Sequence, residues 1–211
     1  MVQKDHIMRI IEQFADFLWA IVFNKKTHNY GLALIKIEET YNGLLHLNPN
    51  EIKYAGVSEI INKNTNKDIL HTDNIEIMAT LLFQEADILE KIHGINMLSN
   101  IFYYKSFELF LHIYNYTGNS KYCKNIEEVI AKLEYYSLGN NIIFTMYEYF
   151  LKIEFYGKAE DKLYCLLDND YPNIKEEIKN FYGQILEKDD IVLGRGNLPR
   201  NEIIEALKQL R

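Results

Sequence analysis

Glycine and proline are scarce in this 211-residue chain, which contains ten and three of them, respectively. All-β folds need many tight turns, which these two residues supply, whereas helices joined by short loops need few. Hydrophobic residues make up 48% of the chain and charged residues 25%, a composition typical of a globular protein. The composition therefore predicts an all-α protein.

The spacing of apolar residues supports helices along the whole chain. Apolar residues between Ile7 and Val22 recur at i, i+3, i+4 and i+7, and a second stripe lies between Tyr30 and Leu45. Pro49 after Asn48 is typical of a helix start, and this third helix is expected to run to about Asn62. Later helices are expected at 73–94, 96–117, 120–137, 141–155, 158–168, 172–187 and 199–210. We expect about nine or ten helices, arranged as antiparallel hairpins in a single domain of residues 1–211.

Two segments interrupt the helical pattern. Residues 62–73 are rich in Asn, Lys and Thr, and we expect a mobile loop there. Leu193 to Asn197 contains two glycines and is expected to form a loop before a final amphipathic helix at 198–211. No segment shows the strict alternation of a strand.

Charge and hydropathy argue against two classes of partner. The formal net charge is −7, which opposes binding to nucleic acid, because such binding depends on neutralising phosphates. The strongest apolar run, Phe17 to Phe23, is far shorter than the roughly 20 residues of a membrane helix. Cys123 and Cys165 form no metal-binding pattern and are interpreted as reduced thiols. We therefore expect a cytoplasmic protein that binds neither nucleic acid nor a membrane.

The chain lacks a recognisable catalytic arrangement. No nucleophile-elbow, Walker or dinucleotide-binding motif occurs, and the six histidines are scattered. Glu90 and His93 match the E-x-x-H spacing of di-metal helical bundles, but no second copy accompanies them. We therefore expect no catalytic residues, no metal site and no cofactor, and interpret the chain as a protein other than an enzyme.

A helical repeat is suggested by the spacing of small and aromatic residues. Tetratricopeptide repeats place small residues where two helices approach closely, with an aromatic residue between them. Three degenerate copies of this pattern occur, at Tyr30–Leu34, at Gly94 to Ser106, and at Tyr156 to Pro172. The spacing predicts an irregular tetratricopeptide-like array.

The first fifty residues resemble a known family. Lys4–Gln13 reads KDHIMRIIEQ and is followed by Asn24-Lys25-Lys26 and the 30–47 helix. This segment is similar to an uncharacterised family, a domain of unknown function found mainly in Firmicutes, which opens with K-D-x-I-M-R-x-I-E-Q. The resemblance is close over residues 3–50 and looser around 85–116. It implies a tetratricopeptide-like fold in a cytoplasmic bacterial protein, and it implies no activity.

Charged residues recur on one face of the first helix. Asp5, Arg9, Glu12 and Asp16 follow an i, i+4, i+7, i+11 spacing. One interpretation is a solvated surface, since isolated surface charge pairs contribute only about 0.3 kcal/mol. The alternative, with Asp5, Arg9 and Glu12 as its candidate residues, is contact with a partner or with another protomer.

Tyrosines are concentrated in the second half of the chain, where thirteen of the sixteen lie between Tyr103 and Tyr182. Tyrosine is favoured at interfaces, and Tyr103, Tyr104 and Tyr135 are candidate partner contacts. The alternative is packing between helices, with the hydroxyls satisfied internally.

Three functions remain open at this point. The first is a non-catalytic interaction module that binds an unidentified protein or peptide. The second is a small-molecule sensor or enzyme whose pocket, lined by Tyr and Glu, lies between helices. The third is a structural homo-oligomer that uses the first or last amphipathic helix.

Overall fold

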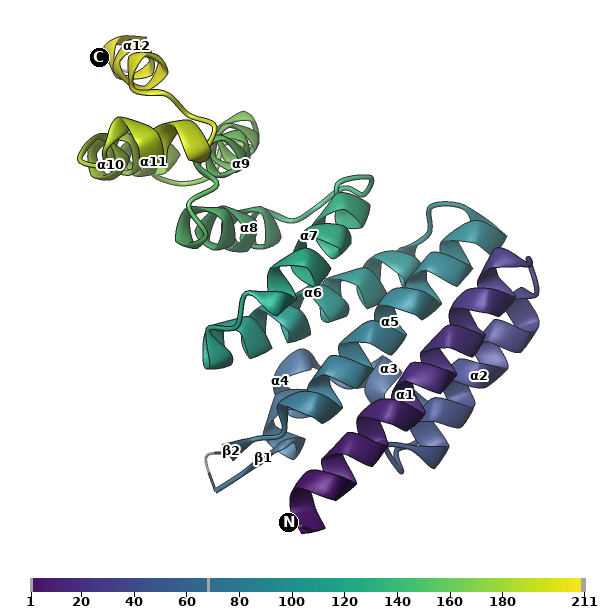
Figure 1. The fold of residues 1–211 in the computed structure, drawn as a ribbon. Coiled ribbons are helices and arrows are strands. Elements are labelled where there is room, and N and C mark those ends of the chain that lie inside the picture. The colour runs from purple at the N-terminus through teal and green to yellow at the C-terminus, as the bar shows by residue number, and fades with distance from the viewer. Residues whose placement is uncertain (1, 68, 210–211) are drawn as a thin grey trace. The chain divides into compact units, whose positions relative to one another are not determined.

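The computed structural model describes residues 2–67 and 69–209, with side chains described at position 10 and from position 12 onward. These residues form twelve helices and one two-stranded hairpin, so the predicted all-α helical array is confirmed (Figure 1). Contacts divide the chain into two compact units, Met1–Tyr136 (unit 1) and Ser137–Arg211 (unit 2). The single domain expected over residues 1–211 stays a prediction.

Unit 1 contains seven of the helices. In chain order its elements are α1 (Val2–Lys26), α2 (Tyr30–Gly43), α3 (Pro49–Tyr54), α4 (Val57–Lys63), β1 (Thr65–Asn66), β2 (Ile69–Leu70), α5 (Thr72–His93), α6 (Met97–Thr117) and α7 (Lys121–Leu133). In Figure 1, α5 lies between α6 on one side and the α1–α2 hairpin on the other. This central position explains why α5 has so many buried residues, among them Ile75, Met78, Leu81, Leu82 and Ala86.

The α5–α6 hairpin is formed by local sequence signals. Gly94 follows α5 with φ of 72°, a conformation that a residue with a Cβ adopts only with strain. Asn96 then caps α6, because its Oδ1 accepts a hydrogen bond from the Ser99 backbone N–H at 3.0 Å. Farther along, the buried Ser106 hydroxyl donates to the carbonyl of Ala79 at 2.8 Å. These small residues let α5 and α6 approach closely.

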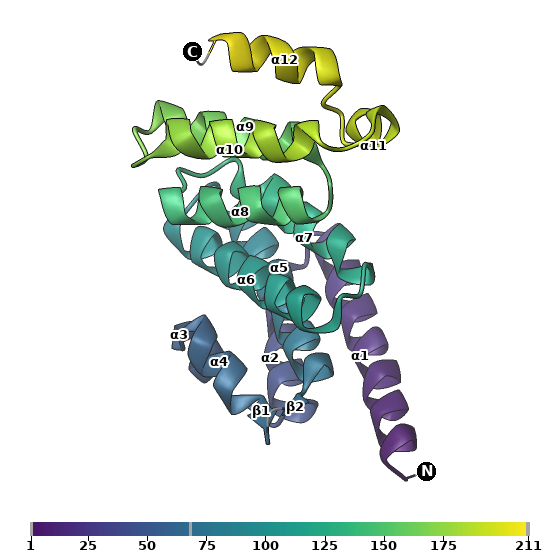
Figure 2. The ribbon, with the colours of Figure 1, turned by 90° about the vertical axis from the view of Figure 1, so that its left-hand side faces the viewer.

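Unit 2 contains the remaining five described helices. They are α8 (Asn140–Lys152), α9 (Tyr156–Asp168), α10 (Ile174–Leu186), α11 (Asp190–Arg195) and α12 (Arg200–Gln209). Figure 2 shows α9 and α10 lying along one another, and Leu163 and Leu166 of α9 and Ile178 of α10 are fully buried. Gly196 touches the start of α9 so closely that an added Cβ would lie 2.4 Å from the Tyr156 ring. Glycine is therefore required at that crossing.

The boundaries differ from the sequence-based expectation in three places. The expected third helix is two helices, because Ala55 and Gly56 adopt extended backbone between α3 and α4. The expected loop at 62–73 contains the β1–β2 hairpin, in which Thr65 pairs with Leu70 and Asn66 with Ile69. Most of the expected glycine-rich loop is the C-terminal part of α11, whose N-cap Asp189 accepts a hydrogen bond from the Val192 backbone N–H at 2.9 Å. Caps and packing outweighed the local glycine content.

Candidate functional site

The outward face of α1 carries a stripe of exposed side chains from residue 12 to residue 26. This outer stripe of α1 consists of Glu12, Asp16, Trp19, Phe23 and Lys26, all of which are exposed. Trp19 is the only tryptophan of the chain and is 68% exposed, while Phe23 is 49% exposed. Their rings stack with centroids 5.2 Å apart and planes inclined by 12°. The two rings form neighbouring exposed apolar surface, and contiguous exposed apolar surface is what often marks an interaction site.

Interactions on the opposite face hold this part of α1 in place. Ile21 is fully buried, and Lys25 lies against α5 rather than in solvent. The Lys25 ammonium contacts the Asp87 carboxylate at 2.9 Å and donates to the Gln84 side-chain oxygen at 2.6 Å. The helix is thereby fixed in rotation, with the outer stripe directed away from the core.

The second helix adds exposed apolar surface of its own. Ala33, Ile37 and Tyr41 on α2 are fully buried, whereas Leu32 and Ile35 are about half exposed. The α1–α2 hairpin therefore exposes two pairs of large apolar side chains, while its inner face packs on α5 of the same unit.

Asp87 forms the centre of a charge network beneath this hairpin. Its carboxylate is contacted by Lys25 from α1, by Lys91 from α5 at 3.2 Å, and by Lys132 from α7 at 2.9 Å. Burial opposes the ionisation of Asp87, but hydrogen bonds from Lys132 and Lys25 outweigh it and hold the pKa of that carboxyl well below its usual range. Asp87 thus stays ionised and links three helices.

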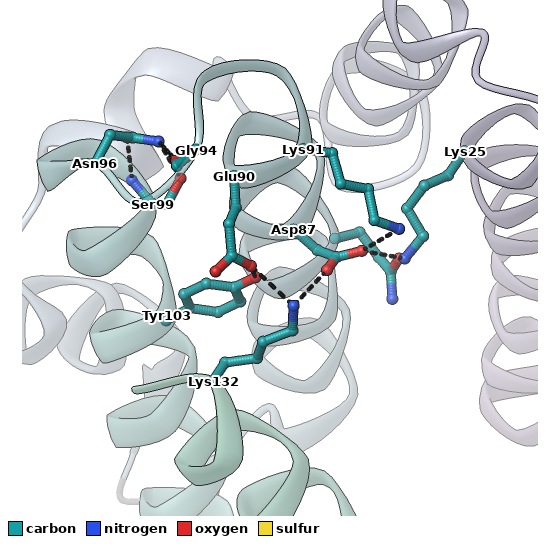
Figure 3. Close-up of polar contacts among 10 residues, drawn as sticks. Lys25, Asp87, Glu90, Lys91, Gly94, Asn96, Ser99, Tyr103 and Lys132 are labelled. Carbon is teal, nitrogen blue, oxygen red and sulfur yellow. Dashed lines mark hydrogen bonds and ion pairs between the residues drawn. The ribbon is translucent and has the colours of Figure 1, made fainter. Parts of the chain in front are cut away.

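Glu90 extends the network toward α6. Figure 3 shows the Lys132 ammonium between the carboxylates of Asp87 and Glu90, with a distance of 2.8 Å to Glu90. The Tyr103 hydroxyl donates to the same Glu90 oxygen at 2.8 Å. Burial, and after it this hydrogen bond, raises the pKa of the Tyr103 hydroxyl well above its usual value, so the hydroxyl stays protonated and acts as the donor. These side chains contact one another, and the network serves to hold α5, α6 and α7 together.

The predicted partner-contact residues are placed in different environments. Asp5 and Arg9 belong to α1, but their side chains lie outside the described residues; Glu12 is exposed on the outer stripe. Tyr103 is fully buried and has no surface to offer a partner. Tyr104 is half-buried and donates to Glu108 within α6, whereas Tyr135 is 70% exposed. Glu12 and Tyr135 lie on different helices, and the structure shows no contact between them.

Sequence reasoning missed the aromatic part of the outer stripe. The ridge of Asp5, Arg9, Glu12 and Asp16 continues at the same three- and four-residue spacing through Trp19 and Phe23. Phe17 to Phe23 is an apolar run, but the spacing alone places Trp19 and Phe23 on the charged face of the helix. This signal was sufficient to find them.

Tyr–Glu pairs occur, but they fill the space between helices. In unit 2, the Tyr147 hydroxyl donates to Glu177 at 3.0 Å, and that of Tyr182 donates to Glu160. A hollow of about 520 Å³ lies elsewhere, where α2 leads into α3. Its polar lining consists of Glu38, Asn42, His46, Asn48 and Asn50, with no tyrosine.

Two further findings concern metals and membranes. Among the side chains that the structure describes, no three His, Cys, Asp or Glu residues are grouped closely enough to hold a metal ion. Glu90 is occupied by Lys132 and Tyr103, and His93 is exposed at the end of α5. None of the described helices combines the length and the apolar character needed to cross a membrane.

The fold and the outer stripe define an all-α helical array with an exposed aromatic surface on its first helix. The chain belongs to the family of unknown function DUF6483, whose model matches residues 1–211. The match extends beyond the first fifty residues, where the sequence resemblance was close. Neither a curated protein nor a solved structure matches the chain.

Proposed function

We propose that this chain is a non-catalytic helical-repeat module that binds a protein or peptide through the outer stripe of α1. The stacked Trp19–Phe23 pair is the observation that carries the proposal. Tryptophan is enriched among residues that dominate binding energy, and a large exposed apolar surface with charged residues at its edges is typical of an interaction site. Glu12, Asp16 and Lys26 supply such charged edges.

The inner packing of the helices supports a tetratricopeptide-like repeat. Small residues at the repeat positions, Ala33, Ser99, Ser106 and Ala159, are all fully buried. Burial of small residues between helices is what the repeat pattern requires. The resemblance of the first fifty residues adds a bacterial source among the Firmicutes and a cytoplasmic location to the proposal.

Selection from a displayed peptide library, with the full chain as bait, tests the proposed function. We expect enriched peptides whose affinity falls at least about tenfold for the Trp19→Ser/Phe23→Ser variant, since aromatic anchors commonly contribute about 2 kcal/mol or more. Tyr54→Ser is the matched control, because Tyr54 is 83% exposed in the same unit but lies on α3. Peptides that bind both variants equally, or a selection that enriches none, would contradict the proposal.

A small-molecule sensor is the second candidate, and the hollow beside α3 favours it. A volume of about 520 Å³ lies within the range of small-ligand sites. A thermal-shift screen of polar metabolites, repeated on Glu38→Gln and His46→Ala, would identify a ligand that needs these two side chains. Stabilisation that persists in both variants would contradict this second function.

A further inference from the structure

The outer stripe of α1 has the spacing of a helix-pairing seam. Its members lie at residues 12, 16, 19, 23 and 26, so steps of four and three residues alternate. This is the spacing of the a and d positions at which two paired helices meet, and two neighbouring members of the stripe, Trp19 and Phe23, are apolar. All five side chains are exposed, so none of them belongs to the core of the described part of the chain.

The charges on the stripe are ordered along the helix. Two acids, Glu12 and Asp16, precede the aromatic pair, and one base, Lys26, follows it. The neighbouring Lys25 is directed inward to Asp87 and contributes nothing to the stripe. A surface that is acidic at one end, aromatic in the middle and basic at the other is complementary to an identical surface turned end for end.

We infer that the outer stripe of α1 binds the same stripe of a second copy of this chain, with the two helices antiparallel about a two-fold axis. The inference rests on the proposed function and names the partner of that surface. A two-fold interface is self-complementary, so each contact occurs twice.

Aromatic and charge pairing select one register. An antiparallel pair sets a positions against d positions, and of the registers that this allows, one places Trp19 against Phe23 of the partner subunit and Asp16 against Lys26 of the partner subunit. Two aromatic layers then lie at the centre, with an ion pair on each side. A parallel pair would instead set Asp16 against Asp16 and Lys26 against Lys26, so like charges would oppose it.

The length of the stripe sets the expected strength. Fifteen residues span roughly 22 Å of helix, and an interface of this length is smaller than that of most permanent dimers. We therefore expect a reversible dimer with a dissociation constant on the order of 10 μM.

Sedimentation velocity of the full chain between about 1 and 500 μM tests this inference through a charge exchange. Asp16→Lys alone and Lys26→Asp alone each place like charges together, and each should weaken the dimer at least about tenfold. The double variant Asp16→Lys/Lys26→Asp restores both pairs and should recover the wild-type dissociation constant to within about threefold. Lys124→Asp is the control, because the Lys124 side chain is 86% exposed on α7, away from the stripe.

Each outcome decides the inference. A monomeric wild-type chain over the whole range, a dimer that ignores the single variants, or a double variant that stays dissociated overturns it. A monomer that still binds peptides through Trp19 overturns the dimer but leaves the proposed function intact. A dimer rescued by the charge exchange, combined with a peptide selection that enriches nothing, limits the surface to self-association and overturns the wider proposal.

Discussion

Asp87 in unit 1 and Glu160 in unit 2 are both carboxylates that link helices, yet their environments have opposite effects. Three lysines contact Asp87, and its pKa is held well below the usual range despite burial. Burial raises the pKa of Glu160, and the hydrogen bond from the Tyr182 hydroxyl lowers it only partly. Asp87 is thus stabilised as an anion, whereas the fold favours the protonated form of Glu160.

The pKa values of Asp87 and Glu160 shift in opposite directions because different side chains link the helices around them. Carboxylates along α5 are contacted by lysines of other helices, with Lys25 and Lys132 on Asp87, Lys53 on Glu85 and Lys121 on Glu76. Around α9 and α10, tyrosine hydroxyls donate to glutamates, at Tyr147–Glu177 and Tyr182–Glu160. Charge pairing and hydroxyl pairing should respond differently to pH, to salt and to substitution.

The largest effect is expected at Asp87. Asp87→Asn removes a buried anion that three ammonium groups share, and we expect a loss of about 3 kcal/mol in the free energy of unfolding. Urea unfolding followed by Trp19 fluorescence measures it, since the only tryptophan of the chain lies in unit 1. Glu128→Gln on the exposed Lys124–Glu128 pair is the control and should change stability by less than about 0.5 kcal/mol.

Asp87 also determines how the free energy of unfolding should change in acid. The folded pKa of Asp87 lies below its ordinary value of 3.8, so its contribution to stability is complete above that value and is lost as pH falls toward the folded pKa. Asp87→Asn should therefore flatten the acid limb of the stability curve. An unchanged acid limb would show that Asp87 is not the anion that links these helices.

Removing one tyrosine hydroxyl from each unit compares a glutamate that also contacts a lysine with a glutamate that accepts from a tyrosine hydroxyl. Tyr182→Phe takes away the hydrogen bonds that this hydroxyl makes with Glu160 and with the Tyr164 hydroxyl, at an expected cost of about 2 kcal/mol. Tyr103→Phe should cost only about 1 kcal/mol, because Glu90 keeps Lys132 at 2.8 Å. Circular dichroism during urea unfolding measures both variants. Equal losses would mean that the lysine does not compensate for the missing hydroxyl.

The helices themselves were predictable from the sequence because apolar spacing, Gly94, Asn96 and Pro49 act locally. The break between α3 and α4 at Ala55 was not predictable from the sequence, since it depends on a distant residue. The buried Lys105 on α6 donates to the carbonyls of Lys53 and Ala55 at 2.5 and 2.7 Å, which satisfies the end of α3. No local sequence pattern predicts a contact between residues that lie about fifty positions apart in the chain.

The candidate site was predictable in part. The spacing of Asp5, Arg9, Glu12 and Asp16 identified the exposed face of α1, and its continuation to Trp19 could have been followed in the sequence. The environment of Tyr103 could not be predicted from the sequence, because it is formed by Glu90 and Lys132, which lie on two other helices. Tyrosine content alone does not separate a buried hydroxyl from an exposed one such as that of Tyr135.

A smaller effect of opposite sign is expected at Glu160. Glu160→Gln keeps an oxygen that accepts from Tyr182 and removes a charge that burial disfavours, so we expect a gain of no more than about 1 kcal/mol at pH 7, given partial solvent screening. The folded pKa lies above the ordinary 4.5, so wild-type stability falls as pH rises from there through the folded pKa, and the variant should lack this fall. Unfolding at pH 4 and pH 7 checks the sign. A variant less stable than wild type at pH 7 would contradict this account of Glu160.

The smallest effect is expected at Glu76, which lies on the same helix as Asp87 but nearer to solvent. Glu76 accepts from Lys121 at 2.8 Å and from the Tyr122 hydroxyl at 2.9 Å, and its side chain is 33% exposed. Glu76→Gln should cost about 0.5 kcal/mol in dilute buffer, and added salt should reduce that cost because exposed charge pairs are screened. Parallel urea titrations at about 0.05 and 1 M sodium chloride measure it, with Asp87→Asn as the comparison. If the two variants lose the same stability and respond equally to salt, neither burial nor the number of contacting lysines distinguishes Asp87 from Glu76.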